Sequence, residues 1–219
     1  MNRKSSPAQV EIPTSDTPID GILSIPPKAK LIVVFAHGHG SSNLNPRNRL
    51  VARSFLERGF GVLLPDLSKD GGHDGASTRE ESYVPRIASR LISIIDWLNE
   101  NPATRGLQIG LFGGRTGGAA VMVAAALRPD KVRAVISRGG RPDLAEDLLH
   151  QVQAPTLMIV GGNDPDHILH NRKASEQMPG RSMLELIQGA NHLFAEPGKL
   201  EQVASISGLW FQRSLALCG

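Results

Sequence analysis

Short apolar runs alternate with longer amphipathic stretches along the chain from about residue 30 onward. The short runs are rich in Val, Ile and Leu, which is typical of strands that are buried on both faces of a parallel sheet. We therefore predict strands at LIVVFAH (31–37), GVLLPD (61–66), LQIGLF (107–112), VRAVIS (132–137), APTLMIV (154–160) and SMLELI (182–187).

The stretches between these runs carry helical patterns. A shorter helix is predicted to begin after Asn45 as N-cap, with Pro46 in its first turn and Gly59 as its stop. The clearest helix has one apolar stripe at three- and four-residue steps, and Pro85 is expected in its first turn, where proline is tolerated. The stripe consists of Val84, Ile87, Leu91, Ile94, Ile95 and Leu98. Further helices are predicted at 118–127, near 168–178 and near 198–214.

The order of these elements predicts the architecture. Residues 8–26 look like two short antiparallel strands joined by a turn at Thr14–Asp16. The alternation that follows requires right-handed crossovers, so we expect an α/β fold with a mostly parallel eight-stranded sheet and helices on both faces. No long insertion is available to form a cap domain. The ligand crevice of such a sheet lies beyond the carboxyl ends of its strands.

Composition narrows the class of protein. The chain has 219 residues, 40% of them hydrophobic, and a formal net charge of +3. We interpret 1–219 as a single domain, with 1–18 partly irregular. No basic stripe is interleaved with aromatic residues, so nucleic-acid binding is not expected. No apolar run approaches the ~18 residues of a membrane span.

The expected compartment is the cytoplasm. The polar start MNRKSSPAQV lacks the apolar middle region of a secretory signal. The single cysteine, Cys218, cannot form an intramolecular disulfide. The sequence leaves the oligomeric state open.

Four predicted strands are followed by glycine and polar residues. These segments are HGHGSS (37–42), GGRTGG (113–118), GGNDPD (161–166) and GANHLF (189–194). Their order resembles that of the α/β-hydrolase fold, and within it the small, cap-less families similar to dienelactone hydrolase. The resemblance extends over roughly residues 20–215.

The resemblance implies a site. Gly113 to Gly117 match the G-x-S-x-G elbow that carries a nucleophilic serine, but Arg115 occupies the serine position. Asp164 matches the family acid and His192 the family histidine, in the same chain order. The oxyanion hole would use the backbone N–H groups of Thr116 and His39. Because these donors belong to the backbone, neither position needs a particular side chain.

Plainer interpretations remain open. Asp164 could be only a turn residue, His192 a satisfied core histidine, and the glycines a means of tight packing. His37 and His39 are spaced as H-x-H, and with His73 or Asp66 they could form a zinc site. The fuller ligand runs of metallohydrolases are missing, so we expect neither a metal nor another cofactor.

Other hydroxyl groups are weak replacements for the missing serine. Ser137 has no elbow frame around it, and the elbow points Thr116 away from the histidine. Ser41 and Ser42 lie in the segment of the oxyanion loop, where we expect them to contact the substrate.

Arginine cannot replace serine as nucleophile because its guanidinium stays protonated and has no lone pair for attack. Three outcomes follow. His192 and Asp164 could activate water for hydrolysis of a small ester or lactone, or for a lyase reaction, while Arg115 holds an anionic group. The site could instead bind a small anionic ligand without turnover. Finally, Arg115 could fold back onto Asp164 and leave an interaction scaffold.

Overall fold

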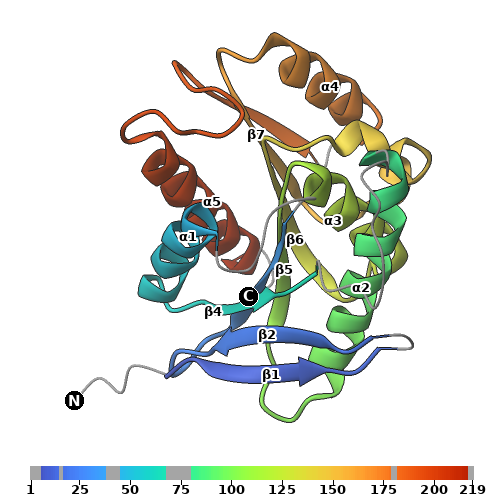
Figure 1. Ribbon diagram of the computed structural model, residues 1–219, viewed down its shortest axis with the longest axis vertical. Helices are drawn as coiled ribbons and strands as arrows, with labels where there is room; N and C mark the ends of the chain where they lie inside the picture. Colours follow the sequence, from blue (N-terminus) through green and yellow to red (C-terminus); the bar gives the residue numbers. More distant parts are fainter. Residues whose placement is uncertain (1–5, 15–16, 38–44, 68–79, 179–181, 217–219) are drawn as a thin grey trace.

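Residues 6–14, 17–37, 45–67, 80–178 and 182–216 are described by the computed structural model of the chain. They form one eight-stranded sheet with helices on both faces (Figure 1). The strand order is β1-β2-β4-β3-β5-β6-β7-β8. The predicted fold class, a mostly parallel sheet without a cap domain, is confirmed.

The strands match the apolar runs closely. They are β1 (Ala8–Ile12), β2 (Ile19–Ser24), β3 (Leu31–Ala36), β4 (Gly61–Pro65), β5 (Gln108–Gly114), β6 (Val132–Arg138), β7 (Thr156–Gly161) and β8 (Ser182–Ile187). The antiparallel pairs are β1–β2 and β2–β4, and all the other pairs are parallel. The carboxyl ends of β3 and of β5 to β8 therefore meet at one edge of the sheet, as the sequence analysis expected.

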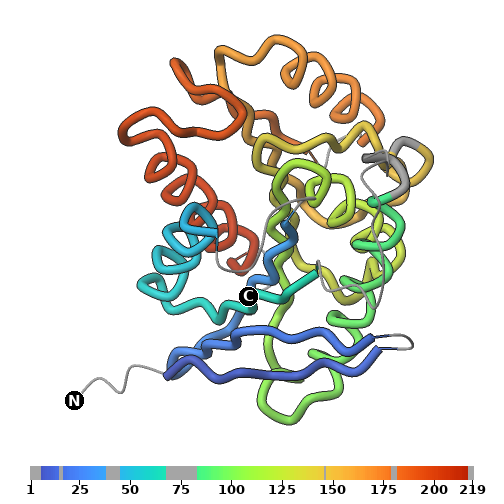
Figure 2. The backbone as a smooth tube through the Cα atoms, viewed as in Figure 1, coloured from blue at the N-terminus to red at the C-terminus, as the bar shows by residue number. Residues whose placement is uncertain are grey.

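Two apolar layers hold the helices against the sheet. The helices are α1 (Pro46–Glu57), α2 (Glu80–Glu100), α3 (Thr116–Leu127), α4 (Pro165–Glu176) and α5 (Lys199–Ala216), with the 3₁₀ segment η1 (Pro142–Gln151) after β6. Helices α1 and α5 lie side by side on one face, although most of the chain separates them (Figure 2). Their layer centres on the packed rings of Phe35, Phe55, Phe112 and Phe211. Helices α2 and α3 cover the other face.

Helix α1 has the predicted caps. The side chain of Asn45 accepts a hydrogen bond from the backbone N–H of Arg47 at 3.0 Å, and Pro46 is the first helical residue. Gly59 follows the helix end with a φ of 82°, a conformation that glycine adopts without steric cost.

Two details differ from the sequence-based expectation. Helix α2 begins at Glu80, so Pro85 lies inside it rather than in its first turn. Proline has no backbone N–H, so Pro85 removes one hydrogen bond near the start of the helix. The long apolar stripe of α2 is buried nevertheless. The segment η1 was not predicted, because it consists of two short 3₁₀ pieces joined at a kink at Ala145 and carries no long helical period.

Helix α3 is the most deeply packed helix. Ten of its 12 residues are buried, because it contacts β5, β6, α2 and η1. Its small side chains allow this close approach. Despite such apolar stretches, no helix in the described ranges combines the length and hydrophobicity that a membrane crossing requires.

Candidate active site

The turn between β5 and α3 places Arg115 at the carboxyl edge of the sheet. Its backbone has φ 53° and ψ −127°, which lies outside the regions that side-chain-bearing residues favour. Such a conformation costs about 1–3 kcal/mol and persists only where the surrounding structure imposes it. The elbow conformation is therefore present, with arginine at its apex.

Close backbone packing imposes this bend. A Cβ atom at Gly113 would overlap the carbonyl oxygen of Gly117, and a Cβ atom at Gly117 would overlap that of Ala36. The carbonyl oxygen of Arg115 accepts N–H groups from Gly118 at 2.9 Å and from Arg141 at 3.1 Å. The two glycines thus let β3, β5 and α3 approach so closely that residue 115 has little freedom.

The guanidinium of Arg115 is exposed and makes no hydrogen bond or ion pair with any described residue. Both oxygens of Asp164 instead bond to histidines. The ion pair between Arg115 and Asp164, which would block the site, is therefore not formed in this structure.

Replacing Arg115 with glycine should relieve the strain at the bend. We expect Arg115→Gly to be more stable than Arg115→Ala by about 1 kcal/mol, because glycine tolerates the positive φ and only part of that gain is lost to its greater freedom in the unfolded chain. Urea unfolding of both variants measures the difference, and alanine controls for loss of the charge. A glycine variant less stable than the alanine variant would show that the backbone is not strained.

Asp164 and His192 lie together, although 28 positions separate them in the sequence. Asp164 caps the N-terminus of α4 after β7, and His192 lies in the loop after β8. His192 Nδ1 is 3.2 Å from Asp164 Oδ2. Because a carboxylate only accepts, Nδ1 carries a proton, and in the neutral form of the ring Nε2 then has the free lone pair that a general base needs. The imidazole is 38% exposed, so a small molecule can reach it.

A second histidine, missed by the sequence analysis, shares the same carboxylate. His167 Nδ1 is 2.9 Å from Asp164 Oδ1, and the backbone N–H of His167 donates to the same oxygen at 3.2 Å. The His167 and His192 rings stack with centroids 5.3 Å apart and planes 5° from parallel. The spacing Asp-x-x-His was the available sequence sign, because the third helical residue faces the capping side chain.

These contacts keep Asp164 ionised. Burial by itself raises the pKa of its carboxyl group, but the hydrogen bonds from His167 and the charges of His167 and His192 outweigh it and hold the pKa below its usual value. The carboxylate is therefore available at neutral pH to orient both imidazoles.

Turns of the chain fix the loop that carries His192. Glu196 accepts the backbone N–H of Asn191 at 3.1 Å, and the Asn191 side chain accepts that of Leu193 at 2.8 Å. A Cβ atom at Gly139, just after β6, would overlap the carbonyl oxygen of His192, and one at Gly140 would lie 3.3 Å from that of Arg115. Gly139 and Gly140 thus lie between the elbow and the loop that carries His192.

The remaining candidates divide into two groups. Thr116 begins α3 beside the elbow with its side chain buried. The Ser137 hydroxyl is buried close to Gly118 and Gly140. His37 Nε2 accepts the backbone N–H of Leu67 at 3.1 Å, which is a structural contact. Four candidates lie outside the described residues: His39, Ser41, Ser42 and His73. Within the described ranges, no cluster of His, Cys, Asp and Glu is arranged to hold a metal ion.

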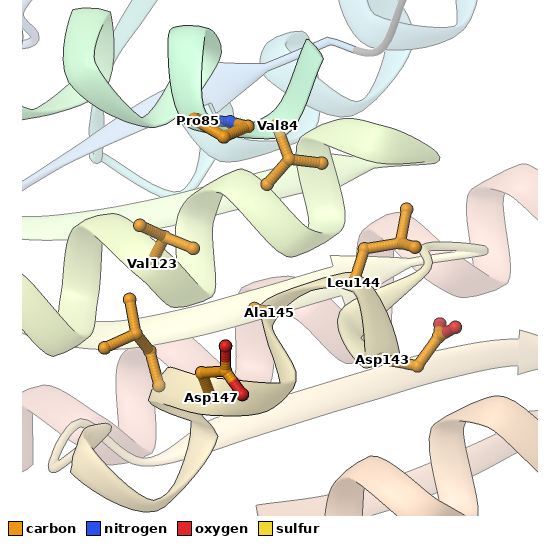
Figure 3. Close-up of a pocket in the computed structure, with 8 residues that line it drawn as sticks. Val84, Pro85, Val123, Asp143, Leu144, Ala145 and Asp147 are labelled. Carbon is orange, nitrogen blue, oxygen red and sulfur yellow. The ribbon is translucent and has the colours of Figure 1, made fainter. Parts of the chain in front are cut away.

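A hollow of about 430 Å³ lies elsewhere, between α2, α3 and η1 (Figure 3). Val84 and Pro85 of α2 and Val123 of α3 form its apolar wall, and η1 supplies Asp143 and Asp147. Asp143 pairs with Arg141 at 2.7 Å. None of the strand-end residues described above lines this hollow.

The sheet order, the strained elbow and the later acid and histidine define an α/β-hydrolase fold. The sequence pattern of the dienelactone hydrolase family matches residues 19–214, and the chain belongs to that family. It is similar to the crystal structure of a dienelactone hydrolase from Anabaena variabilis, with a TM-score of 0.88 and 43% identity over 96% of this chain and 99% of that one. Est1E from Butyrivibrio proteoclasticus shares the fold, with a TM-score of 0.78 at 17% identity over 95% of this chain and 99% of that one.

Two longer relatives come from strains of Mycobacterium tuberculosis. Each is 46% identical over 204 residues and bears the name "Putative phosphoribosyl transferase". The match covers 93% of this chain and 45% of each relative, so the chain spans about half the length of these relatives.

Proposed function

We propose that the protein hydrolyses a small ester or lactone by activating water with His192 and Asp164. The observation that carries this proposal is the 3.2 Å contact that orients a solvent-accessible imidazole beside the elbow. Membership of the dienelactone hydrolase family supports a hydrolytic role. Hydrolysis without a serine requires water as the nucleophile, since residue 115 offers no attacking group.

The proton path balances without any cofactor. His192 Nε2 removes a proton from water, and the resulting hydroxide attacks the carbonyl carbon of the substrate. The backbone N–H groups of Thr116 and His39 would hold the oxyanion of the tetrahedral intermediate. The C–O bond then breaks, and the imidazolium returns the proton to the leaving oxygen.

Arg115 would supply positive charge where negative charge develops. Its guanidinium is exposed at the elbow and unpaired among the described residues, so it can turn toward a bound anion. An oriented guanidinium lowers the energy of an oxyanion more than that of the neutral ester, which is the condition for catalysis. The same exposed guanidinium also favours a second candidate function, which is binding of a small anion without turnover.

Removing the proposed base tests the proposal. We expect His192→Ala to lower kcat for p-nitrophenyl acetate or a lactone substrate by about 100-fold or more, because general base catalysis typically contributes 10²–10⁴-fold. Asp164→Asn keeps a good helix cap while removing the charge, and we expect it to lower kcat as well. His150→Ala, at an exposed histidine near the end of η1, is the matched control.

Two results would contradict the proposal. The first is a wild-type protein that hydrolyses none of a panel of esters and lactones. The second is a His192→Ala variant as active as His150→Ala. Binding of small anions that persists without turnover would then favour the second candidate function.

A further inference from the structure

The carboxylate of Asp164 receives three contacts, and two of them come from His167. The backbone N–H of His167 at 3.2 Å and its ring Nδ1 at 2.9 Å both contact Oδ1. The other oxygen, Oδ2, lies 3.2 Å from Nδ1 of His192. A carboxylate free to turn about its Cβ–Cγ bond would exchange its two oxygens. The two contacts from His167 oppose that rotation, so Oδ2 stays directed at His192.

The ring of His167 also lies flat against the proposed base. Its plane is 5° from that of the His192 ring, with the centroids 5.3 Å apart. Both rings direct Nδ1 at the same carboxylate, so the stack and the carboxylate together restrict the tilt of the His192 ring. His167 therefore covers one face of His192, whose side chain is still 38% exposed.

Two imidazoles on one carboxylate also restrict where protons can be held. With both rings neutral, Asp164, His167 and His192 carry a net charge of −1, and the proton that His192 takes from water brings the charge to zero. If His167 is already protonated, the same step places two cations in the stack. Like charges at this separation disfavour each other, so a protonated His167 opposes proton uptake by His192.

Few other charges act on the ring of His167. His170, one turn further along α4, is the third histidine nearby, with its ring centroid 6.5 Å away. Helix α4 packs on η1, β7 and β8. Within the described ranges, no charged side chain of those three elements forms an ion pair or hydrogen bond with His167. Asp164 and His192 are therefore its main electrostatic partners.

We propose that His167 is a positioning residue for His192, which it orients through the shared carboxylate and the ring stack, and that its protonation switches the base off. The inference rests on the proposed function, because it assigns control of the same base to a further residue. His167 acts through Asp164 and His192 and makes no contact with the substrate.

Two substitutions separate the donor of His167 from its ring. His167→Phe keeps a flat ring and removes the N–H donor, and we expect it to lower kcat by about tenfold with little change in KM, because only the orientation of the base is lost. His167→Asn keeps an N–H donor in place of Nδ1, and it should recover much of that loss. Melting temperatures of both variants show whether they are folded at the assay temperature.

The pH dependence of kcat distinguishes positioning from a purely structural role. Toward acid pH, we expect the wild type to lose activity with about two protons, because both imidazoles must be neutral, and His167→Asn with about one. His170→Asn is the matched control, since His170 lies on the same helix and makes no contact with Asp164 in the described part of the chain. It should keep the pH profile of the wild type.

The carboxyl group of Asp164 gives a measurement that needs no turnover. Burial raises the pKa of this group, and the hydrogen bonds and charge of His167 lower it. Carbon-13 NMR of the Asp164 carboxyl group should therefore show a higher pKa in His167→Phe than in the wild type. His167→Asn should lie between them, because it keeps a donor and loses the charge.

Three results would overturn the role of His167. They are a His167→Phe variant with the kcat of His170→Asn, acid limbs of equal slope in the wild type and His167→Asn, or an unchanged pKa of Asp164 in His167→Phe. If the wild type hydrolyses nothing, the proposed function fails, and the NMR measurement still decides whether His167 holds the carboxylate: a raised pKa supports that contact and an unchanged one refutes it.

Discussion

Substituting Arg115 with serine is expected to raise kcat/KM for p-nitrophenyl acetate by about 100-fold or more over the wild type. The elbow conformation, with φ at 53°, and the His192–Asp164 contact at 3.2 Å are both present, so the substitution supplies the nucleophilic hydroxyl that Arg115 does not offer. In serine triads, loss of a member leaves only about 10³–10⁴-fold catalysis over water, so restoring the nucleophile has a large possible effect.

The mechanism of the serine variant should also differ. A serine at the elbow would form an acyl-enzyme, which appears as a burst of p-nitrophenol in the first turnover. Arg115→Ala removes the charge without adding a hydroxyl and should show no burst. The double variant Arg115→Ser with His192→Ala should lose the gain, because the serine then has no base.

The rates of these variants show whether the elbow still presents residue 115 to His192 and whether the arginine alone prevents the serine chemistry. If Arg115→Ser is no faster than Arg115→Ala, the elbow no longer presents residue 115 to His192, and the account of the site fails. If the serine variant is fast and the wild type is inactive, the fold keeps a hydrolase site in which arginine silences the chemistry.

Much of the fold could be predicted from local pattern alone. The apolar runs gave β3 and β6 to β8 within about two residues, because strands buried on both faces require continuous apolar side chains. The caps of α1 were predicted equally well, since the Asn45 side chain bonds to a backbone N–H only two residues away and Gly59 acts through its own positive φ. Segment η1 was not predicted, because 3₁₀ turns depend on tertiary contacts more than on a repeating pattern.

The candidate site was predicted only in part. The pairing of Asp164 with His192 was implied by the resemblance to the family, and it agrees with the strand order, since parallel strands bring their carboxyl ends to one edge. The second contact, from His167, depends on a side-chain rotamer in the first turn of α4, which sequence spacing does not determine.

Gly117→Ala tests the close approach that shapes the elbow. Helix propensity alone predicts a gain of up to about 1 kcal/mol, because alanine favours a helix more than glycine does. The added Cβ would overlap the carbonyl oxygen of Ala36, and a backbone atom cannot move aside as a side chain can. Overpacking of this kind costs about 1–3 kcal/mol, with the upper end expected where the atom met is backbone, so we expect a net loss of about 1–2 kcal/mol in the free energy of unfolding.

A graded series makes this prediction sharp. A Cβ atom at Gly110 would lie 2.6 Å from the Phe211 ring, a side chain that can shift, so Gly110→Ala should lose less stability than Gly117→Ala. Gly106→Ala meets no atom within 4 Å and should stay within about 0.5 kcal/mol of the wild type. Urea unfolding of the three variants gives the order. If Gly117→Ala is as stable as Gly106→Ala, then β3, β5 and α3 are not held at backbone contact. The strained conformation of Arg115 would then need another cause, because we expect the close backbone contact of β3, β5 and α3 to impose that conformation.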